Sequence, residues 1–482
     1  MLTIRGGQQR VCQGVSRRDV LRAAGTGLFG VSLSKVLAAE EMAEPFQGGR
    51  AKSVLFLYLF GGPSQLETFD LKPTAPSALR GPFKPIASRT PGLLISEHLS
   101  RCAQISDKFA VIRSMTHPYN DHGAAHYIQT GHPHPNRFGD NPDEAPVGDR
   151  EWPAMGSVIE YLSQQAPKNV QRPVPDYVYF PNRLGALQGV ERPGQYAGWL
   201  GKAYNALATD IRKRGEDDNP YFRDCDDSEL DFRIRGLLTK TQMPLDRLDR
   251  LDRRHSLLEQ FDQQRKLLDE SPAAESYNKM RERAFTLVRS EKIRRALDIR
   301  QESAAMRDRY GRHLFGQSTL MGRRMLEAGA RFVTVTWDAP DGYSWDSHGD
   351  SRDLQNYLLP GFDQTFSALI TDLEDRGLLE ETLVVVVGEM GRTPRANDSW
   401  GRGHWSHCFP ALLAGAGIRG GIVYGRSDQD AAYPIEHPTS PADLTATIFY
   451  ALGIDPEMRI RDRQNRPVAL VDGGQPLLQL FG

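Results

Sequence analysis

The chain has 482 residues, of which 60 are Lys or Arg and 61 are Asp or Glu, so its net charge is −1. This balance excludes a strong overall attraction to nucleic acid or to an anionic membrane, and we expect no nucleic-acid partner. With 39% hydrophobic residues, 45 glycines and 31 prolines, the composition is that of a globular protein rather than a low-complexity one.

Near the N-terminus a paired arginine precedes an apolar stretch. Arg17 and Arg18 are followed by the weakly apolar residues 23–37 and then by Ala38 and Ala39. This pattern is typical of a twin-arginine export signal, with a cytosolic amphipathic helix as the alternative. We therefore expect residues 1–39 to engage the twin-arginine export machinery and the protein to be periplasmic or otherwise exported. The stretch is about 15 residues long, shorter than the ~20 that span a bilayer, so no stable membrane span is expected.

The rest of the chain, 50–482, alternates apolar runs with helix-like segments. Apolar runs bounded by turn residues are typical of strands buried on both faces of a parallel sheet, and their alternation with helices is typical of an α/β fold. We predict a mostly parallel central sheet with helices on both faces. Its strands are expected at 53–60, 109–112, 177–180, 332–337, 383–388 and 411–414.

A charged region between about 183 and 312 carries no strong strand signal. Within it, segments 245–268 and 277–299 place Leu, Phe, Met and Ile at helical spacing among many Arg and Asp residues. We therefore predict a helical insertion that packs on the α/β domain.

The loops after the apolar runs are where a site is expected, because ligands of such folds gather at the carboxyl ends of the strands. The first loop carries Glu67 and Asp70, which are either site acids or the cap of a helix. The second carries Asp121, His122 and His126, in a stretch where five of the 12 histidines fall between 117 and 134. His122 and His126 are four residues apart, a spacing that lets them share one face of a helix.

The later loops add more polar side chains. Asp346 and His348 offer a carboxylate and an imidazole together, which suits Zn²⁺, Mn²⁺ or Fe²⁺, or alternatively a hydrogen bond that holds the loop. Glu389 ends a strand, and Arg392 follows it, where a guanidinium commonly clamps an oxyanion. Such strand ends together can supply a metal centre. Its candidate ligands are Glu67, Asp70, Asp346, His348, Glu389, His404 and His407.

Five segments, taken in order, resemble a known family. They are KSVLFLYLFGGPSQLETFD, THPYNDHGAAHYIQTGH, RFVTVTWDAPDGYSWDSHGD, VVVVGEMGRTPRAND and GRGHWSHCFPALLAGAGIRGGIVYG. From about residue 52 to the end, the chain resembles the exported bacterial family catalogued as domain of unknown function 1501. More distantly, it is similar to the alkaline phosphatase and sulfatase superfamily, which implies an alkaline-phosphatase-like fold.

The superfamily resemblance also implies roles for individual residues. The superfamily's metal ligands fall on Glu67 or Asp70, on Asp346 with His348, on Glu389, and on His404 or His407. Its nucleophile is Ser, Thr or a modified Cys, whereas this chain has Asp121 or His122 in that place. The usual Asp-His-Gly at the strand end is Glu389-Met390-Gly391 here, so that one imidazole is missing or is replaced by His122, His126 or His407.

The resemblance implies an exported metal-dependent hydrolase that acts on sulfate or phosphate esters, with a small anionic ester or a sulfated glycan as substrate. One or two divalent cations (Zn, Mn, Ca or Mg) would polarise an ester oxygen, and Arg392 would neutralise the developing charge. A metal-bound water or Asp121 would attack, and His122 completes the expected catalytic residues. The alternative is a non-catalytic exported protein that keeps the fold and binds anionic, sulfated polysaccharide.

Overall fold

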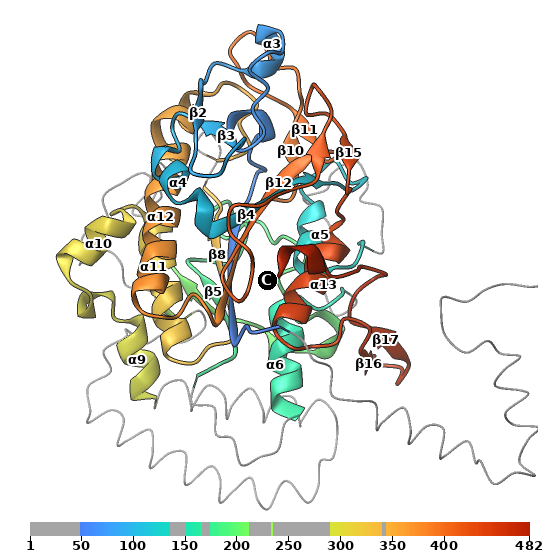
Figure 1. Cartoon of the computed structure of the whole chain (residues 1–482). Helices are drawn as coiled ribbons and strands as arrows, with labels where there is room; N and C mark the ends of the chain where they lie inside the picture. Colours follow the sequence, from blue (N-terminus) through green and yellow to red (C-terminus); the bar gives the residue numbers. More distant parts are fainter. Residues whose placement is uncertain (1–48, 135–150, 166–173, 212–232, 235–289, 340–343) are drawn as a thin grey trace, which may run out of the picture. The chain divides into compact units, whose positions relative to one another are not determined.

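The computed structural model describes residues 49–134, 151–165, 174–211, 233–234, 290–339 and 344–482 (Figure 1). The expected export signal, 1–39, lies outside these residues. Within the described residues, none of the helices combines the length and the apolarity needed to cross a membrane.

The described residues form a central sheet of nine strands in the order β13-β4-β12-β9-β1-β8-β5-β6-β7. β1 lies in the middle and is parallel to β8 on one side and to β9 on the other. β12 is antiparallel to β4 and β9, and β7 is antiparallel to β6. The predicted mostly parallel sheet is therefore confirmed. The strands are β1 Ser53–Leu59, β4 Phe109–Met115, β5 Tyr177–Phe180, β6 Leu207–Asp210, β7 Arg233–Ile234, β8 Phe332–Trp337, β9 Thr382–Val387, β12 Phe409–Ala414 and β13 Val423–Tyr424.

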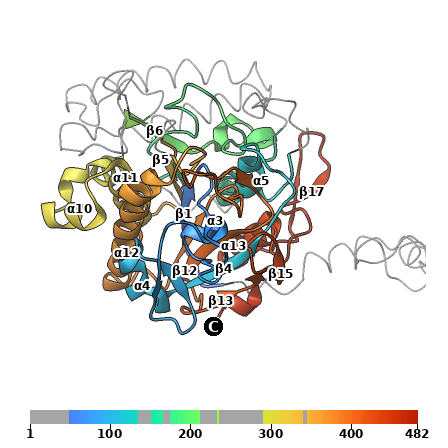
Figure 2. The same ribbon diagram turned by 90° about the horizontal axis from the view of Figure 1, so that it is seen from above.

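Helices cover both faces of the sheet. Figure 2, seen from above, shows α11 and α12 on one side of the strands and α5 and α13 on the other. α11 is Leu314–Glu327 and α12 is Leu359–Asp375. On the other face, α5 is Ala124–Thr130, α6 is Met155–Gln165 and α13 is Pro441–Ala451.

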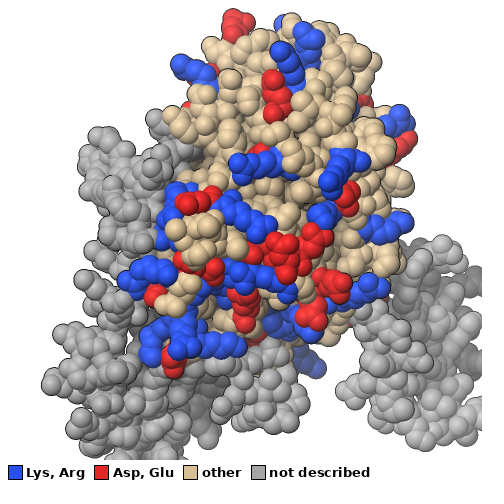
Figure 3. Space-filling view, turned by 60° about the vertical axis from the view of Figure 1, so that its left-hand side comes forward, with Lys and Arg blue, Asp and Glu red and all other residues tan. Residues whose placement is uncertain are grey.

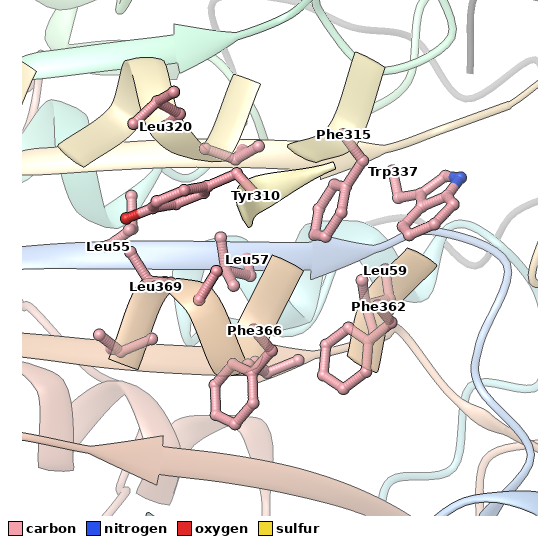
Figure 4. Close-up of a cluster of buried hydrophobic side chains, with 14 of the residues drawn as sticks. Leu55, Leu57, Leu59, Tyr310, Phe315, Leu320, Trp337, Phe362, Phe366 and Leu369 are labelled. Carbon is pink, nitrogen blue, oxygen red and sulfur yellow. The ribbon is translucent and has the colours of Figure 1, made fainter. Parts of the chain in front are cut away.

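Strand β1 is apolar throughout because its side chains enter two separate cores. Successive side chains of a strand point to opposite faces. Leu55, Leu57 and Leu59 pack with the aromatic side chains of α11 and α12, as Figure 4 shows. Val54, Phe56 and Tyr58 enter the core under α5, α6 and α13. Each fully buried side chain of this kind contributes about 1.5–3 kcal/mol of burial free energy, so the centre of the sheet is a rigid support for the loops at its ends.

Short elements complete the described structure. The short helices are α3 Ser77–Arg80, α4 Ser100–Gln104, α9 Glu291–Leu297 and α10 Ala304–Tyr310, with a π-helical turn at Leu354–Leu358. Single 3-10 turns lie at Gln65–Glu67, Ser106–Lys108, Gly198–Leu200, Lys202–Tyr204, Ile299–Gln301 and Leu478–Leu480. Four hairpin-like pairs are β2 Pro85–Ala87 with β3 Leu94–Ser96, β10 Gly391–Arg392 with β11 His404–Trp405, β14 Arg426–Ser427 with β15 Pro434–Glu436, and β16 Arg459–Arg461 with β17 Pro467–Ala469.

The region predicted as a helical insertion, about 183–312, is only partly helical where it is described. Its first part holds two 3-10 turns and β6, which pairs with β5 in the main sheet, and its last part holds α9 and α10. Strand β6 escaped prediction because it is only four residues long and ends in Asp210. Segment 245–268 and most of segment 277–299 lie outside the described residues.

The face that carries α9 to α12 shows Lys and Arg interspersed with Asp and Glu (Figure 3). Beneath it, the buried guanidinium of Arg323 binds Glu302, Glu327 and Asp372. Mixed charges of this kind produce no large field of one sign.

Candidate metal centre

The carboxyl ends of β1, β8 and β9 meet at a tight turn of two glycines. Gly61 and Gly62, which follow β1, have φ angles of 109° and 83°, a region that favours glycine. A Cβ atom on Gly61 would overlap the backbone nitrogen of Asp346, and one on Gly62 would press on the carbonyl oxygen of Met390. The two glycines therefore let the loops after β8 and β9 close over the end of β1.

Three imidazoles and one guanidinium converge on the carboxylate of Asp346. His122 Nε2 lies 3.1 Å from Asp346 Oδ2. His348 Nε2 and His404 Nε2 lie 3.0 and 3.1 Å from Asp346 Oδ1, and the guanidinium of Arg392 binds the same oxygen. The Asp346 side chain is 23% exposed, so the cluster is open to solvent.

The small β10–β11 ladder explains why two of these partners come from one hairpin. Arg392 and His404 face each other across the antiparallel pair. Cross-strand neighbours project to the same side of a ladder, and both side chains reach Asp346.

Glu389 orients His122 from behind. His122 Nδ1 lies 2.8 Å from Glu389 Oε1, while its other ring nitrogen faces Asp346. The Gly61 N–H donates to both oxygens of Glu389, at 2.8 and 3.1 Å, and the Tyr58 hydroxyl donates at 3.3 Å. A carboxylate behind an imidazole fixes the ring orientation and tautomer, an arrangement common for metal-binding histidines.

The electrostatics of the cluster favour a protonated, positively charged His122 beside an ionised Asp346. Burial alone would lower the pKa of His122, but Asp346 and Glu389 raise it to about 9. Burial would raise the pKa of Asp346, but His122, His404 and Arg392 hold it well below its usual range. Burial and the charge of Arg392 lower the pKa of His348, against the opposing effect of Asp346. A cation at His122 would have to displace the proton that this pKa implies.

The donor set fits a borderline divalent cation. Donor atoms of His122, Asp346 and His404 all lie within 4.8 Å of one another, and this is the group of metal-ligand type found among the described residues. Two imidazole nitrogens and one carboxylate oxygen suit Zn²⁺ or a similar transition metal, whereas Ca²⁺ and Mg²⁺ prefer all-oxygen sites. His348, whose side chain is 51% exposed, lies at the rim of the group.

Arg392 is placed differently from the anion clamp expected from the sequence. Its side chain is fully buried, and its Nε donates to the carbonyl of Gly62 at 3.1 Å. Its NH1 donates to the carbonyl of Arg402 at 3.4 Å, and its NH2 donates to Asp346. Because protein groups occupy these nitrogens, Arg392 acts as a positioning residue for Asp346.

The two acids of the first loop lie apart from this cluster. Glu67 is buried and pairs with the buried Arg402, whose Nε lies 2.9 Å from Glu67 Oε1. Asp70 is buried too, and it binds Lys72 at 3.0 Å and the Ser427 hydroxyl. The expected role of these acids as metal ligands is therefore not supported, because basic and hydroxyl side chains already occupy both carboxylates.

Three further sequence candidates also face other partners. Asp121 accepts a hydrogen bond from the Gly123 N–H at 2.7 Å, so its carboxylate caps the turn before α5. The ring of His407 lies against Trp405 and Tyr433, with centroids 5.1 and 5.5 Å away. α5 begins only at Ala124, so His122 and His126 do not share a helical face, and His126 Nδ1 contacts the carbonyl of His132 at 3.0 Å.

Sequence reasoning missed other polar groups near the strand ends. Asp338, the first residue after β8, is buried and accepts hydrogen bonds from the Gly185 N–H and the Gln188 amide, at 2.6 and 3.2 Å. Burial raises its pKa to about 6, against the effect of the Gly185 bond. The sequence marks Asp338 only by its position directly after a buried strand. The sequence does not mark the Tyr58 hydroxyl at all, because the strand that contains Tyr58 reads as uninterrupted core.

Comparisons with known proteins agree with the resemblance seen in the motifs. Residues 51–481 match the family model for a protein of unknown function (DUF1501). A search of the curated proteins finds no match.

Among solved structures, three similar ones illustrate the likeness, all at low identity. The phosphonate monoester hydrolase from Silicibacter pomeroyi is 13% identical, with a TM-score of 0.34 over 89% of this chain and 76% of that one. A protein in the alkaline phosphatase superfamily from Vibrio parahaemolyticus is 11% identical, with a TM-score of 0.34 over 85% and 68%. The PsFucS1 sulfatase from Pseudoalteromonas sp. is 12% identical, with a TM-score of 0.34 over 96% and 77%. Because its family model spans nearly all of the described residues, the chain belongs to the DUF1501 family of proteins of unknown function.

Proposed function

We propose that this protein is an exported metal-dependent hydrolase of sulfate or phosphate esters. The observation that carries the proposal is the convergence of His122, Asp346 and His404, from three separate segments of the chain, on one partly exposed point at the carboxyl edge of the sheet. Glu389 behind His122 supports it, because a purely structural Asp–His contact needs no such second carboxylate.

The three donors would hold the cation, which would supply Lewis-acid polarisation of an ester oxygen. His122 keeps Nε2 toward the site because Glu389 engages Nδ1. His348, half-exposed at the rim, offers an imidazole that is neutral at pH 7, since its pKa is lowered. Its Nε2 lies 3.0 Å from Asp346 Oδ1 and 3.0 Å from His404 Nε2, so it helps to hold these two side chains in place.

Water is the proposed nucleophile rather than a protein side chain. Among the described residues, no hydroxyl or thiol hydrogen-bonds to the side chains of His122, Asp346 or His404. Asp121, the other sequence candidate, is engaged by the Gly123 N–H.

Metal analysis and ester hydrolysis test the proposal together. We expect the purified protein to retain a divalent metal and to cleave p-nitrophenyl sulfate or phosphate, and a chelator to abolish the cleavage. Asp346→Asn is expected to lower hydrolysis by at least about a hundredfold. Asp350→Asn is the matched control, because Asp350 lies in the same loop but binds Arg352.

Two outcomes would contradict the proposal. One is a protein that holds no metal and whose hydrolysis resists chelation. The other is a protein that holds metal but turns over neither ester, which would favour the non-catalytic binding protein.

A further inference from the structure

We propose that a basic cavity beside the metal centre binds an anionic sugar unit, such as a sulfated pyranose. This inference rests on the proposed hydrolase function and names its substrate class. The cavity has a volume of about 410 Å³, within the range of small-molecule sites. It lies between the segment 71–85, which contains α3, and Trp400; Figure 1 shows α3 at the same end of the molecule as β10 and β11.

The charged lining of the cavity is entirely positive. Lys72, Arg80 and Lys84 line it, and no acidic side chain does. Lys72 is held in place by Asp70 and by the Ser427 hydroxyl, at 3.0 and 2.7 Å. Arg80 and Lys84 are exposed, and neither forms a salt bridge with another described residue. Such cations are free to bind the oxygens of a sulfate or carboxylate.

Trp400 gives the cavity a flat apolar wall. Its backbone has a φ of 69°, a left-handed conformation that a bulky residue rarely adopts. Strain of this kind persists where the surrounding structure imposes it, often at ligand sites. Here the Asn397 carbonyl accepts a hydrogen bond from the Trp400 N–H at 3.1 Å. An antiparallel β-bridge also pairs the backbone of Trp400 with that of Asp350. Trp400 is only partly buried and lines the cavity, so part of this residue is accessible to a ligand there.

The loop that carries Trp400 is fastened directly to the metal centre. The Asn397 amide donates to the carbonyl of His348 at 3.0 Å, and the Arg402 N–H donates to the carbonyl of Ser347 at 3.0 Å. Gly401 lies so close to the His348 carbonyl that a Cβ atom would overlap it. A sugar in the cavity would therefore lie one loop away from an ester at Asp346.

The same loop is also hydrogen-bonded to the opposite wall, segment 71–85. The Arg402 guanidinium donates to the carbonyl of Leu79 at 3.0 Å, and the Ala396 N–H donates to the carbonyl of Ala78 at 2.9 Å. Both carbonyls belong to the segment around α3 (Ser77–Arg80) that carries the cationic side chains. The cavity is thus a built feature with both walls tied together.

A sulfated sugar matches the lining better than a bare anion does. Inorganic sulfate would use the cations but would leave the exposed parts of Trp400 and of the apolar wall of Pro73 and Pro85 in water. A pyranose carries both an apolar face, which stacks on an indole, and substituents that reach the cations. Burying that apolar wall contributes affinity in addition to the charge contacts.

Binding measurements test this inference separately from catalysis. Calorimetry with Asp346→Asn, which removes turnover, would compare a sulfated galactose-based tetrasaccharide, its desulfated form, inorganic sulfate and inorganic polyphosphate. We expect the sulfated tetrasaccharide to bind at least tenfold more tightly than the other three probes. Arg80→Ala and Lys84→Ala should each weaken its binding by about tenfold.

Trp400→Asn removes the indole and keeps a residue that tolerates the left-handed backbone, and it should also weaken binding by about tenfold. Lys52→Ala is the control, because Lys52 is exposed at the opposite end of β1. If Trp400→Asn does not fold, the exposed Lys84 and Arg80 variants still decide the question. Equal affinity for polyphosphate, or no effect of these three substitutions, would overturn the inference.

The failures of the two proposals are distinguishable. Tetrasaccharide binding that depends on Lys84 and Trp400 in a protein without metal or turnover would sustain the sugar site and reject the hydrolase. Hydrolysis of small aryl esters that depends on Asp346, with tetrasaccharide affinity indifferent to Lys84 and Trp400, would sustain the hydrolase and reject the sugar site.

Discussion

The backbone N–H of Gly61 donates hydrogen bonds to both carboxylate oxygens of Glu389, at 2.8 and 3.1 Å. This contact joins the end of β1 to the end of β9, its parallel neighbour in the sheet. It also occupies the acid that the sequence had indicated as a metal ligand. Glu389 is consequently a support for His122, and the candidate metal ligands are the side chains in front of it.

Glu389→Gln should weaken metal binding by about 10–100-fold, because the amide no longer fixes the tautomer of His122. Titration of the metal-free protein with Zn²⁺, followed by calorimetry, measures the change. Glu381→Gln is the control, since Glu381 precedes the same strand at its other end and pairs with the exposed Lys52. Unchanged Zn²⁺ affinity in Glu389→Gln would mean that His122 needs no support from behind.

Gly61→Ala should destabilise the fold and abolish metal binding, because the new Cβ overlaps the backbone of Asp346. Gly201→Ala provides a matched control: Gly201 has a φ of 100°, close to the 109° of Gly61, but no atom lies within 4 Å of its added Cβ. The control should lose only about 1–3 kcal/mol, because Gly201, with φ 100° and ψ 155°, adopts a backbone conformation used essentially by glycine. Urea unfolding and metal content of both variants make the comparison. Similar losses in the two proteins would show that the close approach at Gly61 is unimportant.

The main strands were predictable because each is an apolar run buried on both faces. All six expected segments are strands, within a few residues. The antiparallel direction of β12 could not be predicted from the sequence, because an apolar run does not indicate in which direction its strand runs in the sheet. β6, β7 and β13 were missed because they are too short to show a pattern.

The candidate site was predictable only to the level of its loops. Asp346, His348 and His122 lie in loops that follow buried strands, and parallel strands deliver such loops to one edge. His404 lies in β11, just before the antiparallel strand β12, which begins at the same edge. The partners of Glu67 and Arg392 depend on how those loops fold over each other. Arg402, which forms an ion pair with Glu67, lies 335 residues from it in the chain. Nothing in the local sequence marks Arg402 as the partner of Glu67.

Glu67→Gln should lower the free energy of unfolding by about 3–5 kcal/mol while leaving the metal content of the folded protein unchanged. The substitution strands the buried guanidinium of Arg402 without its charge partner. Glu436→Gln, which breaks the exposed pair with Arg426, should change stability by no more than about 1 kcal/mol. Denaturant unfolding and metal analysis check both. Lost metal with unaltered stability would return Glu67 to the role of ligand.

His313 should make the protein less stable below neutral pH. Its Nδ1 accepts a hydrogen bond from the Gly316 N–H at the start of α11, and burial lowers its pKa to about 4 from an ordinary 6.5. Between these values the unfolded chain binds a proton that the folded chain excludes, so stability falls as the pH drops from 6.5 to 4. His313→Asn keeps a capping acceptor and cannot titrate. Urea unfolding across this pH range should show a decline smaller by about 1–3 kcal/mol in the variant; parallel curves would rule out this role.

Export should depend on the guanidinium groups of Arg17 and Arg18 rather than on their charge. The double substitution to Lys preserves both positive charges but removes the planar five-donor fork that distinguishes Arg from Lys. We expect it to leave the protein in the cytoplasmic fraction, because twin-arginine signals are read by a receptor as an address. Arg22→Lys, four residues further on, is the matched control and should be exported normally. Immunoblots of periplasmic and cytoplasmic fractions distinguish the outcomes. Export of the double-Lys protein would assign residues 1–39 to another pathway, since a general secretory signal needs only positive charge before its apolar stretch.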